Sequence, residues 1–236
     1  MNSFLSEYLS KYMRGVNSIE KYIKEKYAYQ RIYDIYKSEF GKSHPVTLIA
    51  LNDLADFYRN MGEFNKALEL HEEVYVKRRD VLGEKHPDTL LALADLADSY
   101  SDLEDYNKAF ELKNIVYNAR KEILGEEHPD TLTALADLAS SYSYFEYHNK
   151  ALEMRNTVYS ARKEILGENH LDTLTALADL ADSYSDLEDY NKANELQDIV
   201  YFARREILGY KHLETLIALR SLVLTELILS ENNEID

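Results

Sequence analysis

The sequence predicts an all-α protein, a right-handed superhelical solenoid of antiparallel helix pairs, and two observations support this fold class. The motif His-Pro-x-Thr-Leu begins at His44, His86 and His128 and continues as His-Leu-x-Thr-Leu at His170 and His212, always 42 residues apart. Between these motifs, apolar residues recur three and four positions apart, as they do in a helix with one apolar face. A single helix pair cannot bury that face, so neighbouring pairs must stack into a continuous core.

Each repeat is expected to contain two helices, A and B, and the second full repeat shows both. Residues 86–103 carry one apolar face, formed by Leu90, Leu93, Leu96, Ala97 and Tyr100. After a short break the pattern resumes over residues 106–124, at Ala109, Leu112, Ile115, Val116, Ala119, Ile123 and Leu124. Pro87 and Pro129 lie at the start of predicted A helices, where a missing N–H group costs little. These stretches are therefore predicted as helix A and helix B.

Glycines and histidines mark the helix ends with the same period. A glycine closes each predicted helix B, at Gly41, Gly83, Gly125, Gly167 and Gly209. Glycine tolerates the left-handed conformation that ends many helices, so each is predicted to be a C-terminal cap. The repeat histidines are one repeat apart, too far to share a metal ion. We interpret them as residues that fix the turn from helix B to the next helix A.

The repeats predict a single solenoid domain over residues 1–236, with about 5.5 repeats. Residues 1–41 are interpreted as a degenerate N-terminal repeat, with a worn helix A at 3–13 and a helix B at 17–40. Residues 210–236 are expected to form a C-terminal capping helix. The four full repeats between them occupy residues 42–83, 84–125, 126–167 and 168–209.

The last predicted helix is apolar on more than one face. Leu219, Leu224 and Ile228 lie off its inward stripe, whereas a capping helix normally presents a polar outer side. Two interpretations remain open. Either the helix is simply apolar and packs against the preceding helix B, or these three residues form a homodimer contact.

The charge balance restricts the class of partner. Lys and Arg number 27 and Asp and Glu number 43, which gives a formal net charge of −16. Nucleic acids and acidic lipids are not expected as partners, because phosphate binding needs clustered Lys and Arg. A basic protein or peptide suits this charge better.

Neither a membrane location nor catalysis is expected. The apolar runs are far shorter than the ~20 residues that cross a bilayer. The first residues lack the pattern of a secretion signal and the chain has no Cys, so we expect a cytoplasmic protein. No phosphate-binding glycine loop, nucleophile motif or His-Glu-x-x-His zinc motif occurs. We therefore expect no enzyme activity, no cofactor and no metal.

The repeat resembles the tetratricopeptide repeat (TPR), in the long form found in kinesin light chains, over about residues 15–230. The Leu-Ala pair and Tyr of the family's helix A are matched in four repeats, first at Leu54, Ala55 and Tyr58. The family's turn Gly-x-Tyr/Phe-x-x-Ala is matched at Gly62, Phe64 and Ala67. Later repeats replace the turn glycine by glutamate, which is expected to need a slightly different turn, at Glu104, Glu146 and Glu188.

The resemblance implies a non-catalytic scaffold or adaptor that binds a protein or peptide along one edge of its A helices, which lines a concave groove. Residues three and four apart share one side of a helix, so carboxylates gather on this edge. One interpretation is a groove for a basic peptide segment or protein. The other is that the aspartates only keep an exposed face solvated. We call these residues the acidic stripe: Asn52, Asp53, Asp56, Asn60, Asp95, Asp98, Asp102, Asp137, Asp179, Asp182 and Asp186.

The third repeat departs from its neighbours at the turn between its two helices. Asp98 and Asp102 of the second repeat give way to Ser140 and Tyr144, and aromatic residues gather there as Tyr144, Phe145 and Tyr147. Aromatic residues on a polar background are typical anchors of protein interfaces. We interpret the three as a candidate anchor, with drift between duplicated repeats as the alternative.

Two functions follow from these observations. The first is a scaffold or adaptor that binds a basic protein or peptide in an acidic groove. The second is a structural spacer that associates with itself through its apolar C-terminal helix.

Overall fold

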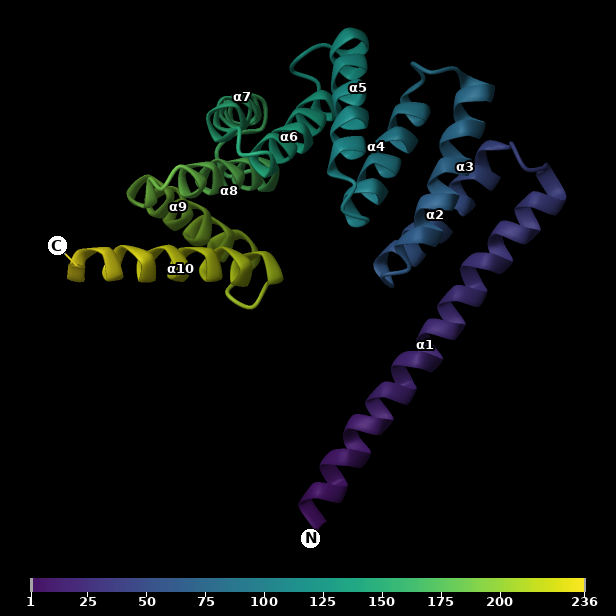
Figure 1. The fold of residues 1–236 in the computed structure, drawn as a ribbon, viewed down its shortest axis with the longest axis horizontal. Coiled ribbons are helices and arrows are strands. Elements are labelled where there is room, and N and C mark those ends of the chain that lie inside the picture. Colours follow the sequence, from purple (N-terminus) through teal and green to yellow (C-terminus); the bar gives the residue numbers. More distant parts are fainter. Residues whose placement is uncertain (1, 236) are drawn as a thin grey trace. The chain divides into compact units, whose positions relative to one another are not determined.

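The computed structural model describes residues 2–235, and within this range the chain forms only α-helices and turns (Figure 1). Side-chain positions are described for residues 20–232. Within α1 to α4 and within α6 to α10, each helix packs mainly against its neighbours in the sequence, which confirms the predicted all-α fold of helix pairs. The helices are α1 (Asn2–Phe40), α2 (Pro45–Asn60), α3 (Phe64–Leu82), α4 (Pro87–Asp102), α5 (Tyr106–Leu124), α6 (Pro129–Tyr144), α7 (His148–Leu166), α8 (Leu171–Asp186), α9 (Tyr190–Leu208) and α10 (Leu213–Ile235).

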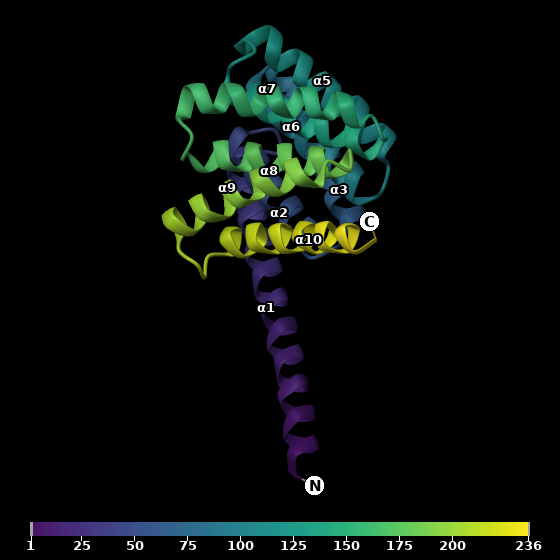
Figure 2. The ribbon, with the colours of Figure 1, turned by 90° about the vertical axis from the view of Figure 1, so that its left-hand side faces the viewer.

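The chain separates into two compact units, one up to Leu112 and one from Lys113, and α5 contains the boundary. In the first unit, α1, α2, α3 and α4 pack in sequence. In the second unit, α6 to α10 do the same, and Figure 2 shows α8, α9 and α10 lying side by side. Helices A and B of the second repeat, predicted over 86–103 and 106–124, correspond to α4 and α5 within one residue at each end.

The N-terminal segment differs from the prediction. A worn helix A at 3–13 followed by a helix B at 17–40 is wrong, because α1 is one continuous helix of 39 residues. The intervening segment holds no proline, and its Gly15 costs a helix only about 1 kcal/mol. The C-terminal part of α1 does take the place of a helix B. There Tyr33 is buried in a core cluster with Leu51 of α2 and Val74 of α3.

The repeat histidines cap the helices that follow them. The Nδ1 atoms of His86, His128 and His170 accept hydrogen bonds of 3.1–3.2 Å from the backbone N–H groups two residues later. His44 and His212 make the same contact at 3.4 Å and 3.3 Å. Such a cap satisfies one of the first-turn donors that a helix leaves unpaired. The predicted role of these histidines in fixing the turn is confirmed.

The glycines that end the B helices are caps, but their conformation is not the left-handed helical one that the sequence predicts. Gly83, Gly167 and Gly209 have φ of 85° to 91° and ψ of 160° to 163°. This region of backbone space is open essentially to glycine alone. The chain adopts it because it must leave the helix directly into an extended linker, which reaches the next histidine at φ near −70° and ψ near 140°.

The glutamates that replace the turn glycine adopt the glycine's own conformation. Gly62 has φ of 77°, and Glu104, Glu146 and Glu188 have φ of 62° to 63°. The hydrogen bonds are also the same: Gly62 N–H donates to the carbonyl three residues back, as Glu104 and Glu146 do. The expected change of turn is therefore wrong. The repeats keep one turn and accept a strained residue in it, at a cost of about 1–2 kcal/mol each.

Relief of this strain is a testable prediction. Glu146→Gly is expected to raise the free energy of unfolding by about 0.5–1 kcal/mol, because the relieved strain exceeds the extra entropy of glycine in the unfolded chain. Urea denaturation followed by circular dichroism measures the change. Glu146→Ala removes the same charge but keeps the Cβ atom, so it should give no such gain. An equal gain from both variants would show that charge, and not the backbone, matters at this turn.

The core of each unit is built from the leucines and small residues of the A helices. In the second unit, Leu132 and Leu135 of α6 pack with Val158 of α7, and Leu177 and Leu180 of α8 pack with Val200 of α9 and Ala218 of α10. The Leu-Ala pair is fully enclosed in every full repeat, since Ala55, Ala97, Ala139 and Ala181 are each 0% exposed. A larger side chain at these alanines would force the helices apart.

An arginine near the end of each helix B ties that helix to the next helix A. Arg78, Arg120 and Arg162 donate hydrogen bonds of 3.1–3.3 Å to backbone carbonyl oxygens ten residues later, in the first turn of the following helix. Arg78 and Arg120 are buried. These arginines are therefore part of the architecture and are not offered to a ligand.

The last helix, α10, is partly covered. Ala218 and Leu222 are buried, and Leu219 is half-buried. Leu224 and Ile228 are 49% and 37% exposed, and Leu216, Val223 and Leu227 are exposed beside them. The positions in α8 that correspond to Leu216 and Val223 are Leu174 and Ala181, and both are buried. One face of α10 is thus exposed where the equivalent face of α8 is covered.

Candidate partner-binding surface

The acidic stripe lies on the A helices, on α2 and α4 in the first unit and on α6 and α8 in the second. Its residues alternate with buried core positions, as Asp95 and Asp98 do with Leu96 and Ala97. Most stripe side chains are half-buried, while Asp53, Asn60, Asp182 and Asp186 are exposed. Many of them contact other side chains of the chain itself, a point that the sequence did not reveal.

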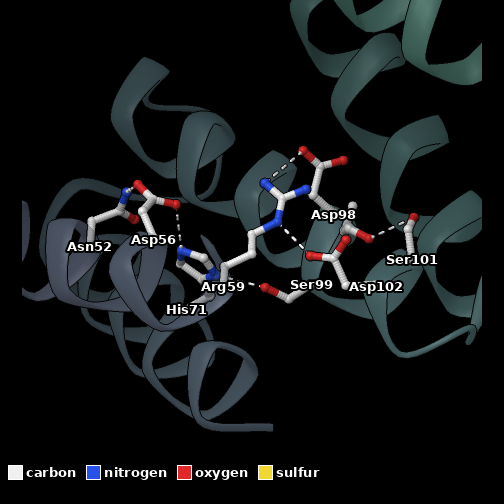
Figure 3. A network of polar contacts seen from close by, with 9 residues as sticks. Asn52, Asp56, Arg59, His71, Asp98, Ser99, Ser101 and Asp102 are labelled. Carbon is white, nitrogen blue, oxygen red and sulfur yellow. Dashed lines mark hydrogen bonds and ion pairs between the residues drawn. The ribbon is translucent and has the colours of Figure 1, made fainter. Parts of the chain in front are cut away.

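Arg59 neutralises part of the stripe in the first unit. It extends from α2 to α4, where its Nε donates to Asp102 Oδ2 at 2.5 Å and its Nη1 lies 3.6 Å from Asp98 Oδ2 (Figure 3). The predicted ligand-binding pair Asp98 and Asp102 therefore shares one guanidinium group. This contact also links two successive A helices.

A second base lies beneath the stripe. His71 of α3 is completely buried, and its Nδ1 lies 2.7 Å from Ser99 Oγ of α4 (Figure 3). Its Nε2 lies 3.4 Å from Asp56 Oδ1 of α2, and Asn52 Nδ2 donates to the other oxygen of Asp56 at 3.2 Å. Asp56 is thus engaged by His71 of α3 and by Asn52 of its own helix.

The second unit repeats this arrangement with an arginine. Arg155 of α7 is buried and donates to Ser183 Oγ of α8 at 2.9 Å. Its Nη1 also lies 4.0 Å from Asp186 Oδ2, which accepts a hydrogen bond from Ser143 Oγ at 2.5 Å. His148 Nδ1 lies 3.8 Å from the same oxygen. Asp186, like Asp102, is therefore engaged within the chain.

His71 and Arg155 occupy the same position of their B helices, and the sequence interpretation did not consider this position. His71, Lys113, Arg155 and Gln197 lie 42 residues apart, in the middle of four successive B helices. Three of the four are basic. A basic residue that recurs at one position of successive B helices indicates that the fold itself supplies positive charge to the acidic stripe. The fourth, Gln197, breaks the series.

Burial raises the pKa of four stripe carboxylates, those of Asp53, Asp95, Asp179 and Asp182. Burial raises the pKa of Asp95, and the nearby Asp56 carboxylate adds to the effect. Burial also raises the pKa of Asp179, although Arg155, Arg162 and Arg204 oppose it. Burial raises the pKa of Asp182 to about 6. A carboxylate with a raised pKa lacks a cation that compensates its charge fully.

The raised pKa of Asp182 predicts a pH dependence of stability. The folded chain holds this proton more tightly than the unfolded chain, so Asp182 lowers stability as pH rises from about 4 to about 6. Because Asp182 is exposed to solvent on one side, we expect a reduced effect of roughly 1 kcal/mol. Asp182→Asn should therefore be more stable than the original chain at pH 7 and equally stable at pH 4, in urea denaturation at both pH values. A larger benefit at pH 4 would contradict this account.

The comparison of Asp182→Asn with the original chain changes one carboxyl group and keeps the charged groups around it. Arg155 opposes the rise in its pKa, and Asp179 and Asp186 increase it. All three remain in Asp182→Asn, so the difference between the two proteins reports Asp182.

The predicted aromatic anchor lies at the end of α6 and in the turn before α7. Tyr144 and Tyr147 are 56% and 62% exposed, and Phe145 is half-buried. The rings of Tyr144 and Phe145 are in edge contact at 5.3 Å between centroids, and Tyr147 packs edge-on against Tyr142 at 6.1 Å. The structure thus brings exposed aromatic surface together in the second unit.

Comparison with known proteins finds a family model that matches the N-terminal part of the chain. The tetratricopeptide repeat family model matches residues 27–75 and 46–122. No match was found among curated protein sequences. Among the residues that the structure describes, no helix is both long and apolar enough to span a membrane.

Several solved structures share the fold. A crystal structure of a Podosopora anserina kinesin light chain with nearly identical TPR-like repeats has a TM-score of 0.65 and 23% identity, and the match covers 84% of this chain and 93% of that one. BtubC (BKLC) from P. vanneervenii has a TM-score of 0.68 at 15% identity, covering 90% and 92%. MamA has a TM-score of 0.51 at 14% identity, covering 82% and 95%.

Proposed function

We propose that this chain, a tetratricopeptide repeat protein whose fold is of the kinesin-light-chain-like type, is a non-catalytic scaffold or adaptor that binds a basic peptide segment or protein along its acidic stripe. The family match and the fold confirm the resemblance predicted from the sequence. Tetratricopeptide repeats serve in general as protein-interaction scaffolds. We place the protein in the cytoplasm, in keeping with the lack of cysteine.

The observation that carries the proposal is the desolvation of carboxylates on one face of the A helices. Asp95, Asp179 and Asp182 have raised pKa values because burial is not offset by the internal bases. A cation from a partner would favour the charged form of these groups and gain from a local dielectric lower than that of water. Acidic segments would be repelled by the same groups.

A co-purification experiment at low and high salt tests this function. The chain is compared with the variant Asp95→Asn/Asp98→Asn/Asp179→Asn/Asp182→Asn. We expect a basic partner that the chain retains at low salt, releases at high salt and loses in the variant. Glu69→Gln/Glu153→Gln/Glu164→Gln/Glu206→Gln is a matched control, since it removes four exposed carboxylates of the B helices. Equal retention by all three proteins would show that the stripe is only a solvated face.

The exposed face of α10 favours a second candidate, a spacer that associates with itself. Leu224 and Ile228 are exposed there, while Leu219 is half-buried and contributes less apolar surface. Contiguous exposed apolar residues favour association. Light scattering after size-exclusion chromatography should then show a mass that rises with concentration, and Leu224→Lys/Ile228→Lys should remain monomeric. A monomer at all concentrations would exclude this candidate.

A further inference from the structure

A cavity of about 180 Å³ lies among α8, α9 and α10 at one end of the acidic stripe. Its lining includes Asp179 and Asp182 of α8, Gln197 and Arg204 of α9, and Ser221 of α10. Its size corresponds to about six water molecules, which is room for one long side chain and not for a folded segment. Its polar groups converge on a small apolar pocket, as they do in many ligand sites.

One residue of the cavity lining, Gln197, has an amide oxygen that lacks a partner. Gln197 is 6% exposed, and its Oε1 accepts no hydrogen bond from the residues that the structure describes. A buried acceptor without a donor costs about 1–3 kcal/mol. In two earlier repeats the residue at this position reaches a serine of the next helix A, since His71 contacts Ser99 and Arg155 donates to Ser183. Gln197 therefore stands where the other repeats place a base.

The charged groups around the cavity also leave an excess of negative charge. Arg204 has its terminal nitrogens engaged, because Nη1 lies 3.3 Å from Glu214 and Nη2 donates to Thr175 at 3.0 Å, while its buried Nε has no hydrogen-bond partner among the residues that the structure describes. Arg155 is engaged with Ser183 and Asp186. Within the described part of the chain, neither Asp179 nor Asp182 has a cation within ion-pair distance. The cavity lining therefore holds two carboxylates, Asp179 and Asp182, and one guanidinium group, that of Arg204.

We propose that this cavity is a subsite that receives one cationic side chain, of arginine or lysine, from the protein partner. The proposal rests on the proposed function and names the chemistry of one contact within it. The incoming group would supply the charge that Gln197 does not, and its N–H groups would donate to Asp179, Asp182 and the Oε1 of Gln197. Hydrogen bonds in which both groups are charged are among the stronger ones in proteins. A neutral side chain would leave the carboxylates uncompensated.

Small blocked amino acids test the subsite without knowledge of the partner. N-acetyl-arginine methylamide and N-acetyl-lysine methylamide are titrated into the isotopically labelled chain, with N-acetyl-citrulline methylamide as the uncharged analogue of the first. We expect the arginine or the lysine probe to shift the side-chain amide resonances of Gln197 and to bind at least tenfold more tightly than citrulline. The two charged probes show which cation the cavity prefers.

Two substitutions locate the binding. Gln197→Arg places a guanidinium group where Arg155 provides one a repeat earlier. The new side chain should fill the cavity and weaken the binding of the charged probe at least tenfold. Asp182→Asn should weaken it as well, and Asp172→Asn, at the exposed start of the same helix, should not. Circular dichroism checks that each variant is folded. If Gln197→Arg does not fold, Asp182→Asn carries the test.

The proposal is overturned if citrulline binds as well as arginine, if neither charged probe binds, or if the folded variants bind the probe as the original chain does. A failure here with a positive co-purification result would leave the acidic stripe intact as a binding surface and remove only the subsite. A probe that binds here while co-purification fails would establish the subsite and contradict the wider function.

Discussion

Replacing Leu138 by alanine is expected to lower the free energy of unfolding by about 3 kcal/mol. Leu138 belongs to α6 and is only 1% exposed, among the most deeply buried large side chains of the described chain. Neighbouring helices enclose it, so the loss of three side-chain carbon atoms leaves a cavity that the packed helices cannot fill. Urea denaturation followed by circular dichroism measures the change.

Ile165→Ala is the matched control. Ile165 lies in α7 of the same unit and is 49% exposed, so its truncation removes a similar volume without opening a cavity. We expect a change below about 0.5 kcal/mol, as for most surface substitutions. If both variants lost the same stability, the core of the second unit would not be organised around the A helices.

Gly167→Ala is expected to lower the free energy of unfolding by about 2 kcal/mol, the second-largest effect. Gly167 ends α7 with φ of 87° and ψ of 163°, a conformation that residues with a Cβ atom avoid. A Cβ atom added there would meet no neighbour within 4 Å, so the cost would come from the backbone alone. Thermal and urea denaturation both report it.

Two results would contradict this account of Gly167. An unchanged stability would mean that the linker to His170 can take another path without cost. A loss of the whole repeat, seen as a smaller helical signal before any denaturant is added, would mean that the cap is required to form the helix. The expected result lies between these two and is opposite in sign to the gain expected from Glu146→Gly.

Most of the fold can be predicted from the sequence because the same signals for helix starts, helix ends and buried faces recur in successive repeats. Pro87 and Pro129 begin α4 and α6, and glycines end the B helices. The apolar spacing of Leu90 and Leu93 identifies the buried face of α4. The N-terminal segment could not be predicted in this way. It lacks the histidine that precedes α2, α4, α6, α8 and α10 and the proline that begins α2, α4 and α6, and nothing in residues 2–40 ends the helix.

The candidate site was predictable in its location and not in its electrostatics. Periodicity places Asp98 and Asp102 on one side of a helix, but only the structure shows that both contact Arg59, which lies one repeat earlier. His71 is a polar residue in a helix of mixed composition, and no local pattern indicates that it is completely buried. Contacts between repeats decide which aspartates are compensated, and such contacts depend on how far each side chain reaches across the helix pair.

The acidic stripe is therefore not a uniform negative surface. Asp56, Asp102 and Asp186 are held by hydrogen bonds or ion pairs within the chain. Asp179 and Asp182 are less well compensated, and they lie beside the cavity that contains Gln197. Binding energy for a basic partner should accordingly be concentrated in the second unit, near α8, and not be spread equally along the A helices.

The most direct test of the acidic stripe is a binding screen of the purified chain against an array of peptides in which only the number of Lys and Arg residues varies. We expect binding to increase with the number of basic residues, to weaken with salt and to fall in the variant that lacks Asp95, Asp98, Asp179 and Asp182. Binding that is independent of peptide charge, or strongest for acidic peptides, would contradict the proposed function.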